Sequence, residues 1–301
     1  MTSKNYNKKS KKYCKQVQNQ LEVHAMMRSG QHAIIFWMFR LIKEPIYFHN
    51  DILCHNDDRV YIDRGHWYNI GRGKKPPIHN FPWYAYNLED ISIKDIKQIK
   101  KKYKKALFVA PFAKHHKVLI LRDPFNLFAS RHRFLYKLNS IREKDGRKPM
   151  KRTQRTNANS EISWFDDRAA NRWKEYAKEY LGITNFLRNN RKIMINYNFW
   201  FADKRYRMNL MSKEFGAQQS DLRNDGSSQS RLNVVAKNGY GSSFDDLTMN
   251  GRAQQMDVLN RWKHFVKNDQ FRSLFEDKEL IDLSSKIYPG LTKNVLKKLR
   301  L

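Results

Sequence analysis

The chain has 301 residues and a formal net charge of +30, with 59 lysine and arginine residues against 29 acidic residues. That length suffices to bury a full hydrophobic core, and the two cysteines exclude a disulfide framework or a cysteine-based zinc cluster. Neither an apolar leader nor a run of about 20 apolar residues is found, so we expect a cytoplasmic protein without a membrane anchor.

Residues 1–20 are polar and rich in lysine, which is typical of a basic disordered tail. A single domain is expected over 21–301. Its first predicted elements are a short strand, a tight turn and an apolar helix. The turn and the start of the helix read Arg28-Ser29-Gly30-Gln31-His32-Ala33. Because the first amides of a helix lack intrahelical partners and carry positive partial charge, this turn predicts a phosphate or sulfate site.

The nature of the anion depends on two residues of this turn. A triphosphate loop places a lysine and a hydroxyl residue after its last glycine, to hold the phosphates and magnesium. Gln31 and His32 stand there instead, and Arg28 supplies the positive charge from the front of the loop. The residues therefore favour an anion held without a metal over ATP with magnesium. An ordinary turn between strand and helix is the plainer alternative.

The next predicted strand, Ile46 to Phe48, ends in His49-Asn50-Asp51. Aromatic residues then gather among glycines and prolines between Asp57 and Leu88: Trp67, Tyr68, Trp83, Tyr84 and Tyr86. Such rings suit stacking on a ligand, and the alternative is that they cover the core. The spacing of apolar residues predicts a lysine-rich surface helix over Asp95 to Lys105. We expect His115-His116 to form a basic surface turn.

The second informative segment is an apolar strand, Lys117 to Leu121, followed by Arg122-Asp123-Pro124 and a helix that carries Ser130. Asp123 suits the N-cap, and proline is tolerated in a first helical turn. Arg122 is expected at the carboxyl end of its strand, the edge at which open α/β sheets bind ligands. Ser130 follows about two helical turns later. The two side chains are therefore candidates to share one phosphate.

Three later segments complete the predicted elements. A basic loop, expected to be mobile, covers about 142–160. A buried strand from Arg191 to Asn196 leads into Tyr197, and a helix follows over Asp203 to Phe215. A basic Gly/Ser-rich loop then contains Lys237 and Gly239, and a solvent-exposed turn is its plainer interpretation.

The two anion-binding segments together resemble the sulfotransferase family, whose members use 3′-phosphoadenosine 5′-phosphosulfate (PAPS) and release adenosine 3′,5′-bisphosphate (PAP). Arg28 to Ala33 is similar to the family's 5′-phosphosulfate loop, although hydroxyl residues usually stand where this chain has Gln31 and His32. Arg122 to Ser130 is similar to its 3′-phosphate segment. The resemblance implies a three-layer P-loop-like α/β fold, with a mostly parallel sheet of about four to five strands flanked by helices.

The resemblance also implies which residues bind the donor. Tyr197 corresponds to a tyrosine that ends a late strand, and Lys237 with Gly239 to a loop that closes over the 3′-phosphate. The implied donor-binding set is Arg28, Ser29, Gly30, Gln31, His32, Ala33, Arg122, Ser130, Tyr197, Lys237 and Gly239. No metal is expected.

Sulfuryl transfer to a hydroxyl or amine needs in-line positioning, neutralised charge and a general base. Arg28 is expected to neutralise charge. Candidates for the base are Asp51, His49 and His66, while His32 is a candidate for direct contact with the transferred group. The basic and aromatic residues favour a small-molecule or glycan acceptor that is anionic or aromatic.

Two other functions are kept as alternatives. A P-loop-like phosphotransferase would bind ATP and magnesium, against which Gln31 and His32 speak. A non-catalytic basic protein would bind nucleic acid through its charge. The sequence has no helix-turn-helix, zinc-finger or RNA-recognition signature, so only weak, salt-sensitive binding of nucleic acid is expected.

Overall fold

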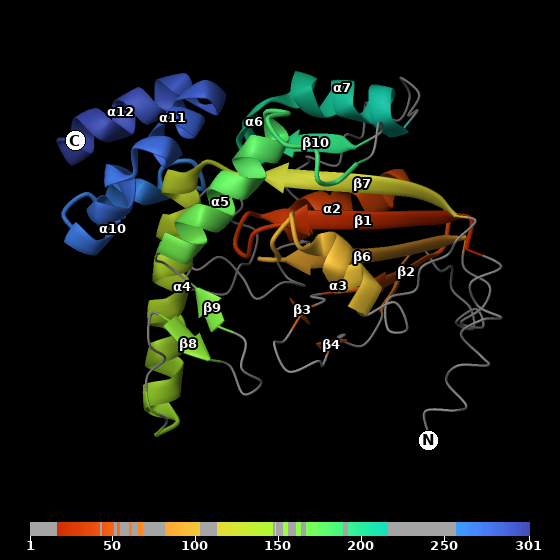
Figure 1. Ribbon diagram of the computed structural model, residues 1–301, viewed down its shortest axis with the longest axis horizontal. Coiled ribbons are helices and arrows are strands. Elements are labelled where there is room, and N and C mark those ends of the chain that lie inside the picture. Colours follow the sequence, from red (N-terminus) through yellow and green to blue (C-terminus); the bar gives the residue numbers. More distant parts are fainter. Residues whose placement is uncertain are drawn as a thin grey trace.

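Six strands form the central sheet, in the order β10-β7-β1-β6-β2-β5 (Figure 1). Their bounds are β1 Asn19–Ala25, β2 Ile46–His49, β5 His66–Tyr68, β6 Trp83–Glu89, β7 Lys114–Leu121 and β10 Ile193–Asn196. Five strands are parallel, and β5 pairs antiparallel with β2 at one edge. The computed structural model describes residues 17–42, 44–50, 53–54, 60–61, 66–68, 82–102, 113–146, 148, 153–155, 161–163, 167–188, 192–215 and 257–301.

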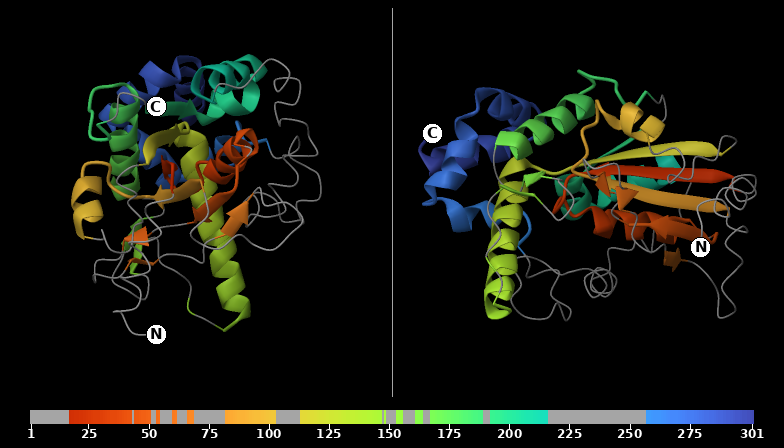
Figure 2. Two further views of the ribbon diagram at one scale, coloured as in Figure 1. Left: turned by 90° about the vertical axis from the view of Figure 1, so that its right-hand side faces the viewer. Right: turned by 60° about the horizontal axis from the view of Figure 1, so that its bottom comes forward.

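Helices cover both faces of the sheet, and Figure 2 (right) shows the resulting layers. The helices are α2 Gln31–Leu41, α3 Ile96–Lys102, α4 Pro124–Lys144, α5 Asp167–Tyr180, α6 Tyr197–Ala202 and α7 Lys204–Phe215. One face packs against α2, α6 and α7, and the other against α3, α4 and α5. The mostly parallel sheet between helices confirms the three-layer α/β fold expected from the sequence.

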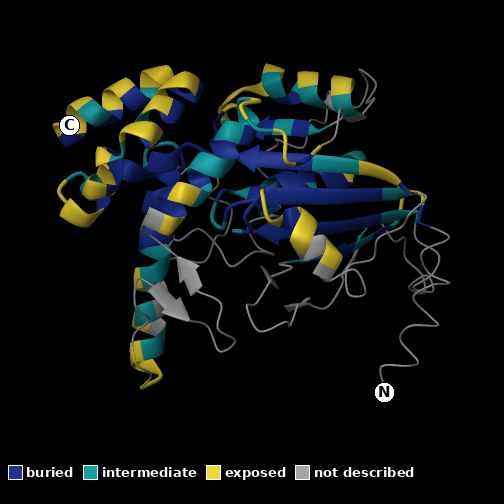
Figure 3. Cartoon of the chain, viewed as in Figure 1, coloured by how far each residue is buried: buried dark blue, intermediate teal, exposed yellow. Residues whose placement is uncertain are grey.

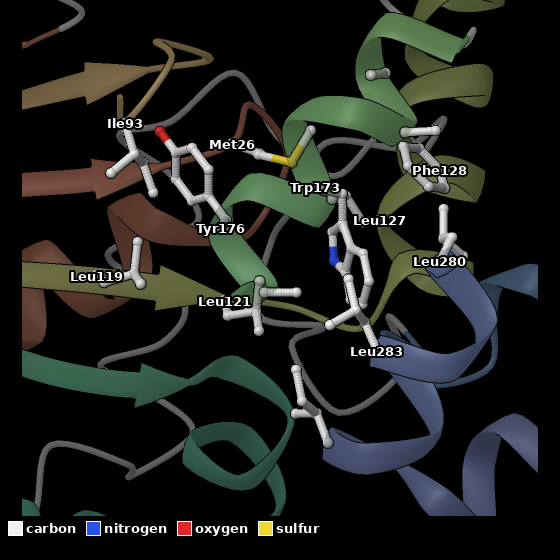
Figure 4. Packing of buried hydrophobic residues seen from close by; sticks show 14 of the residues in the cluster. Met26, Ile93, Leu119, Leu121, Leu127, Phe128, Trp173, Tyr176, Leu280 and Leu283 are labelled. Carbon is white, nitrogen blue, oxygen red and sulfur yellow. The ribbon is translucent and has the colours of Figure 1, made fainter. Parts of the chain in front are cut away.

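Strands buried on both faces explain the apolar runs in β2, β7 and β10, whereas β1 and β6 also carry buried polar residues. Along β1, Leu21, Val23 and Ala25 face α2, and the intervening side chains face the other layer. On that second face, Leu119 and Leu121 of β7 pack near Trp173 and Tyr176 of α5, together with other buried side chains (Figure 4). Figure 3 shows β1 and β6 as buried along most of their length, whereas the first half of β7 is exposed or partly exposed.

The carboxyl ends of the strands point toward α4 and the final helical segment (Figure 1). This segment comprises η2 Arg261–Phe265, α10 Asp269–Ser273, η3 Leu274–Glu276, α11 Lys278–Ile287 and α12 Pro289–Leu299. It packs on α4 and α5 through Phe275, which contacts Phe125 and Phe128 at ring distances of 4.7 and 6.3 Å. The first half of α4 is buried, and its second half is largely exposed beyond the sheet (Figure 3).

Several boundaries differ from the sequence predictions. β7 begins at Lys114, so His115 and His116 belong to this strand and not to a turn. Residues 19–20, assigned to the tail, begin β1. The basic segment expected as a loop from residue 142 starts with the end of α4, and Thr153–Arg155 form β8.

The aromatic segment from Asp57 to Leu88 is the clearest correction. Trp83–Glu89 is β6, a central strand, and Tyr84 and Tyr86 are buried within the core. The alternative that these rings cover the core is therefore right for Tyr84 and Tyr86, and they cannot stack on a ligand.

Two short hairpins, β3 Leu53–Cys54 with β4 Val60–Tyr61 and β8 with β9 Glu161–Ser163, lie outside the main sheet. Among the described residues, no helix is long and apolar enough to cross a membrane.

Candidate anion-binding site

The loop between β1 and α2 has an unusual backbone. Arg28 and Gly30 have φ angles of 69° and 83°, both in the left-handed region. The amide of Ser29 donates to the carbonyl of Met26 at 3.0 Å, which closes the turn. Gly30 is the N-cap of α2 and offers no side chain to the first amides. The loop therefore presents the positive end of an eleven-residue helix at the carboxyl edge of the sheet.

Tyr197 begins α6 and lies against this loop. A Cβ atom added to Gly30 would come within 2.1 Å of Cε2 of Tyr197, so no other residue fits at position 30 without moving the ring. The guanidinium of Arg122 lies over the same ring, 4.9 Å from its centre. The amide side chain of Asn198 donates to the carboxylate of Asp123 at 2.8 Å and ties α6 to the start of α4. Tyr197 is thus fixed between the two predicted anion-binding segments.

Arg122 and Ser130 meet as predicted, and a third residue joins them. Nη1 of Arg122 donates to the hydroxyl of Ser130 at 3.3 Å and to the carbonyl of Arg28 at 3.0 Å. Nη1 of Arg261, at the start of η2, donates to the same hydroxyl at 2.8 Å. Arg122, Ser130 and Arg261 are 2%, 0% and 6% exposed. Two buried guanidinium groups therefore converge on one hydroxyl next to the loop.

Arg261 did not emerge from the sequence. It lies 131 positions after Ser130, so no local spacing connects the two residues. Three hydrogen bonds hold its segment in place: Nη2 of Arg122 donates to the carbonyl of Val258 at 2.5 Å, Asn126 donates to the carbonyl of Leu259 at 2.9 Å, and the amide of Trp262 donates to Asn126 at 3.4 Å.

The arginines raise the cost of each other's charge. Desolvation by burial is the main cause that lowers the pKa of Arg28 to about 10; the charge of Glu89 opposes this shift, and the charge of Arg122 adds to it. Desolvation together with the charge of Arg122 lowers the pKa of Arg261 to about 9. Asp123, next in sequence to Arg122, accepts hydrogen bonds from Asn126 and Asn198 at the start of α4. The cluster is therefore electrostatically suited to an anion.

Several buried polar atoms around the loop have no hydrogen-bond partner among the described residues. They are the hydroxyl of Ser29, both amide atoms of Gln31 and Nε of Arg122. Ser29 and Gln31 are only 1% and 2% exposed. Leaving a buried polar atom without a partner costs free energy. The hydroxyl of Ser29, Nε2 of Gln31 and Nε of Arg122 can all donate to an anion, whereas Oε1 of Gln31 needs a donor. These residues fit a phosphate or phosphosulfate at the loop.

An ion pair behind the loop supports it from the other side. Nη1 of Arg131 donates to both carboxylate oxygens of Asp90, at 2.7 and 3.0 Å, and to the carbonyl of Met27 at 3.3 Å. The same carboxylate accepts the amide of Met27 at 3.1 Å. Asp90 itself has a left-handed backbone with φ 52°. This ion pair fixes where the loop begins. It was not predicted from the sequence, although Arg131 directly follows Ser130.

The structure places the candidate general bases at different positions. Nε2 of His32 lies 2.7 Å from Oδ1 of Asn50, the residue after β2. Nδ1 of His49 lies 2.9 Å from the hydroxyl of Tyr84, on the opposite face of the sheet from α2. His49 is therefore not brought together with His32. Asp51, Lys237, Gly239 and the side chain of His66 lie outside what the structure describes.

Comparisons with known proteins add no family name. No model of a known protein family matches the chain, and no curated protein matches its sequence significantly. The assignment of a function therefore rests on the geometry described above.

Proposed function

We propose that this protein is a PAPS-dependent sulfotransferase that transfers a sulfuryl group to a hydroxyl or amine acceptor. One observation carries the proposal: Arg122 and Arg261 converge on Ser130 immediately beside the Arg28 to Gly30 loop. Two adjoining sites for anions suit a ligand with two anionic groups on one ribose. PAPS has this form, with a 5′-phosphosulfate and a 3′-phosphate.

The residues divide between these two groups. Arg28, Ser29 and Gln31, with the first amides of α2, are suited to the 5′-phosphosulfate. Arg122, Ser130 and Arg261 are suited to the 3′-phosphate, because an arginine fork matches a phosphate. The donor supplies an activated sulfuryl group, and the protein contributes positioning and fixed positive charge.

The acceptor molecule would bind on the side of the donor site nearer β2 and β5. The strands β7 and β1, in the other half of the sheet, lead into Arg122 and Arg28. Near β2 and β5, Phe36 of α2 and Tyr68 of β5 pack at a ring distance of 5.3 Å, and both are partly exposed. Such a wall suits a sugar ring or an aromatic acceptor. The net charge of +30 favours an anionic acceptor.

A thermal-shift titration tests the donor site. The full chain is titrated with PAP, with adenosine 5′-monophosphate, which lacks the 3′-phosphate, and with ATP plus magnesium. PAP at 100 times its dissociation constant should stabilise the fold by about 2.7 kcal/mol. Adenosine 5′-monophosphate should bind at least about tenfold more weakly, because it leaves Arg122 and Arg261 without their anion.

Two variants separate the site from general stability. Arg122→Met should abolish the response to PAP. Arg207→Met removes another buried arginine, which contacts the carbonyls of Trp200 and Phe201 away from Ser130, and should keep the response. A response to ATP with magnesium but not to PAP would instead favour a phosphotransferase. If no nucleotide raises the melting temperature, the basic surface would instead favour a nucleic-acid-binding function.

A further inference from the structure

The connection between α5 and β10 exposes two apolar side chains to water. Ile183 and Phe186 lie three positions apart in this connection and are 57% and 48% exposed. Leu187, the next residue, is buried in the core and anchors the segment. Single exposed apolar residues are common on protein surfaces, so these two gain meaning only from the way in which the surrounding structure holds them.

The backbone of this segment is held by an unusually complete set of hydrogen bonds. The side chain of Glu179, at the end of α5, is fully buried. Its carboxylate accepts four hydrogen bonds, from the hydroxyl of Thr184, the amides of Phe186 and Leu187 and Nζ of Lys192. The amides of residues 181–184 donate to carbonyls in the last turn of α5, and Nζ of Lys117 donates to the carbonyl of Leu187. The segment therefore presents its two apolar side chains in a fixed arrangement, which lowers the entropy cost of binding a partner.

The charge around these side chains is positive. Residues 180–202 include three basic residues and no acidic residue. Arg188, which follows the anchoring Leu187, is exposed. The carboxylate of Glu179 is paired with Lys192, and that of Glu279 on α11 is paired with Lys178 of α5. The segment thus combines exposed apolar and cationic side chains, which is the combination that binds anionic membrane surfaces.

This segment lies at the opposite end of the sheet from the anion site. It leads into Ile193, the first residue of β10, which pairs with Val118 of β7. Arg122 follows the last residue of β7, and the two strands are parallel. Lys114, the first residue of β7, adds an exposed cation at the same end as the segment. A surface that binds this end of the sheet leaves the anion site uncovered.

We propose that residues 181–188 dock the protein on an anionic membrane surface, with Ile183 and Phe186 inserted at the level of the lipid headgroups and Arg188 beside them. Binding of single-stranded nucleic acid uses aromatic rings that stack on bases, and Ile183 has no ring. A second copy of the chain would carry the same charge of +30 and be repelled. A fluid lipid surface accepts both side chains without a complementary pocket. This inference does not depend on the proposed sulfotransferase function.

Flotation of the full chain with lipid vesicles tests the proposal. Vesicles of phosphatidylcholine alone are compared with vesicles of equal parts phosphatidylcholine and phosphatidylserine, and we expect binding to the second kind. Ile183→Ser and Phe186→Ser should each weaken this binding by about tenfold, because an apolar side chain no longer enters the lipid. Phe186→Trp should preserve it, because an indole ring suits the membrane interface.

Phe199→Ser is the matched control. Phe199 is 47% exposed, almost the same as Phe186, but it lies on α6 beyond the other end of β10. This variant should bind the anionic vesicles as the wild type does. Added salt should weaken the wild type less than Phe186→Ser, because screening acts on charge and not on apolar insertion.

Three outcomes would overturn the proposal. Equal binding by Phe186→Ser and Phe199→Ser would show that net charge alone attracts the chain to lipid. Failure of the wild type to bind the anionic vesicles would exclude a membrane as the partner. Weakened binding of Ile183→Ser and Phe186→Ser to single-stranded DNA, with vesicle binding unchanged, would make the segment a contact for nucleic acid. No nucleotide donor enters the experiment, so its result is separate from that of the PAP titration.

Discussion

The ring of Tyr197 lies against Cα of Gly30, and a single added carbon at Gly30 would overlap Cε2 at 2.1 Å. Tyr197 comes from the start of α6 and Gly30 from the cap of α2, so this contact sets the spacing of two elements that are distant in sequence. It also places the ring beneath the guanidinium of Arg122. The glycine is therefore required by packing as well as by its left-handed backbone.

Replacement of Gly30 should reveal both requirements. Gly30→Ala must strain a backbone at φ 83° and displace Tyr197, so we expect a loss of about 3 kcal/mol in the free energy of unfolding and loss of PAP binding. Gly182→Ala is the matched control, because its φ is 72° but no atom lies within 4 Å of the new carbon. It should cost about 1 kcal/mol and preserve PAP binding. Equal losses in urea unfolding would contradict the role of the ring.

Two buried arginines should respond oppositely to removal of their charge. Arg261→Met removes a positive charge repelled by Arg122, so the ligand-free protein should keep or gain about 1 kcal/mol of stability while its response to PAP disappears. Arg131→Met leaves the carboxylate of Asp90 without its ion-pair partner and should cost about 3 kcal/mol. Chemical unfolding with and without PAP measures both. Equal destabilisation would show that Arg261 is a structural residue.

Asn126 should couple binding to the final helical segment. Asn126→Leu removes the side-chain bonds to Leu259, Trp262 and Asp123, which should cost about 2 kcal/mol and weaken PAP binding because Arg261 loses its anchor. Asn268→Ala removes only the N-cap of α10, where the side chain accepts the amide of Phe271 at 2.8 Å. This control should cost about 1 kcal/mol and leave the affinity for PAP unchanged. Calorimetric titration distinguishes the two variants.

Glu179 gives a prediction for acid stability. Burial would raise the pKa of Glu179, but hydrogen bonds from Lys192, Thr184 and two backbone amides outweigh it and hold this pKa below its usual value of 4.5. The folded state therefore binds the proton more weakly than the unfolded state. The stabilisation from Glu179 is complete above the unfolded pKa and is lost as the pH falls through the lowered folded pKa.

Unfolding of wild type and Glu179→Gln across pH 3–7 checks this sign. The difference in unfolding free energy should be constant near neutral pH and should shrink below about pH 4.5. Glu276→Gln, a change at an exposed carboxylate, serves as the control. A difference that grows toward acid pH would contradict the prediction.

Local signals predicted the elements around one half of the candidate site. A strand, a turn and a helix follow one another within a few residues around Gly30 and again around Arg122, so spacing placed the turn between β1 and α2 and the meeting of Arg122 with Ser130. Capping by Asp123, which accepts the amide of Asn126 at 2.8 Å, is likewise local chemistry and was predicted. Arg261 and Asp90 reach the site only through tertiary packing, which local sequence patterns do not predict.

The failure at β6 has a physical cause. The sequence of β6 lacks the apolar run typical of a central strand, because Tyr84 and Tyr86 bring hydroxyl groups into the core. The hydroxyl of Tyr86 donates to Glu22 at 2.6 Å, and that of Tyr84 meets His49 at 2.9 Å. Polar groups on adjacent strands thus satisfy one another, and neither strand read alone shows it.

The dependence of the site on Val258 to Trp262 bears on how the protein is made. Arg122 and Ser130 leave the ribosome long before the segment that carries Arg261, since 136 positions separate Arg122 from Val258. All strands of the main sheet are synthesised before Arg261, so the cluster of Arg122, Ser130 and Arg261 is completed last. The contact of Arg261 with Ser130 can therefore form only after translation has passed η2.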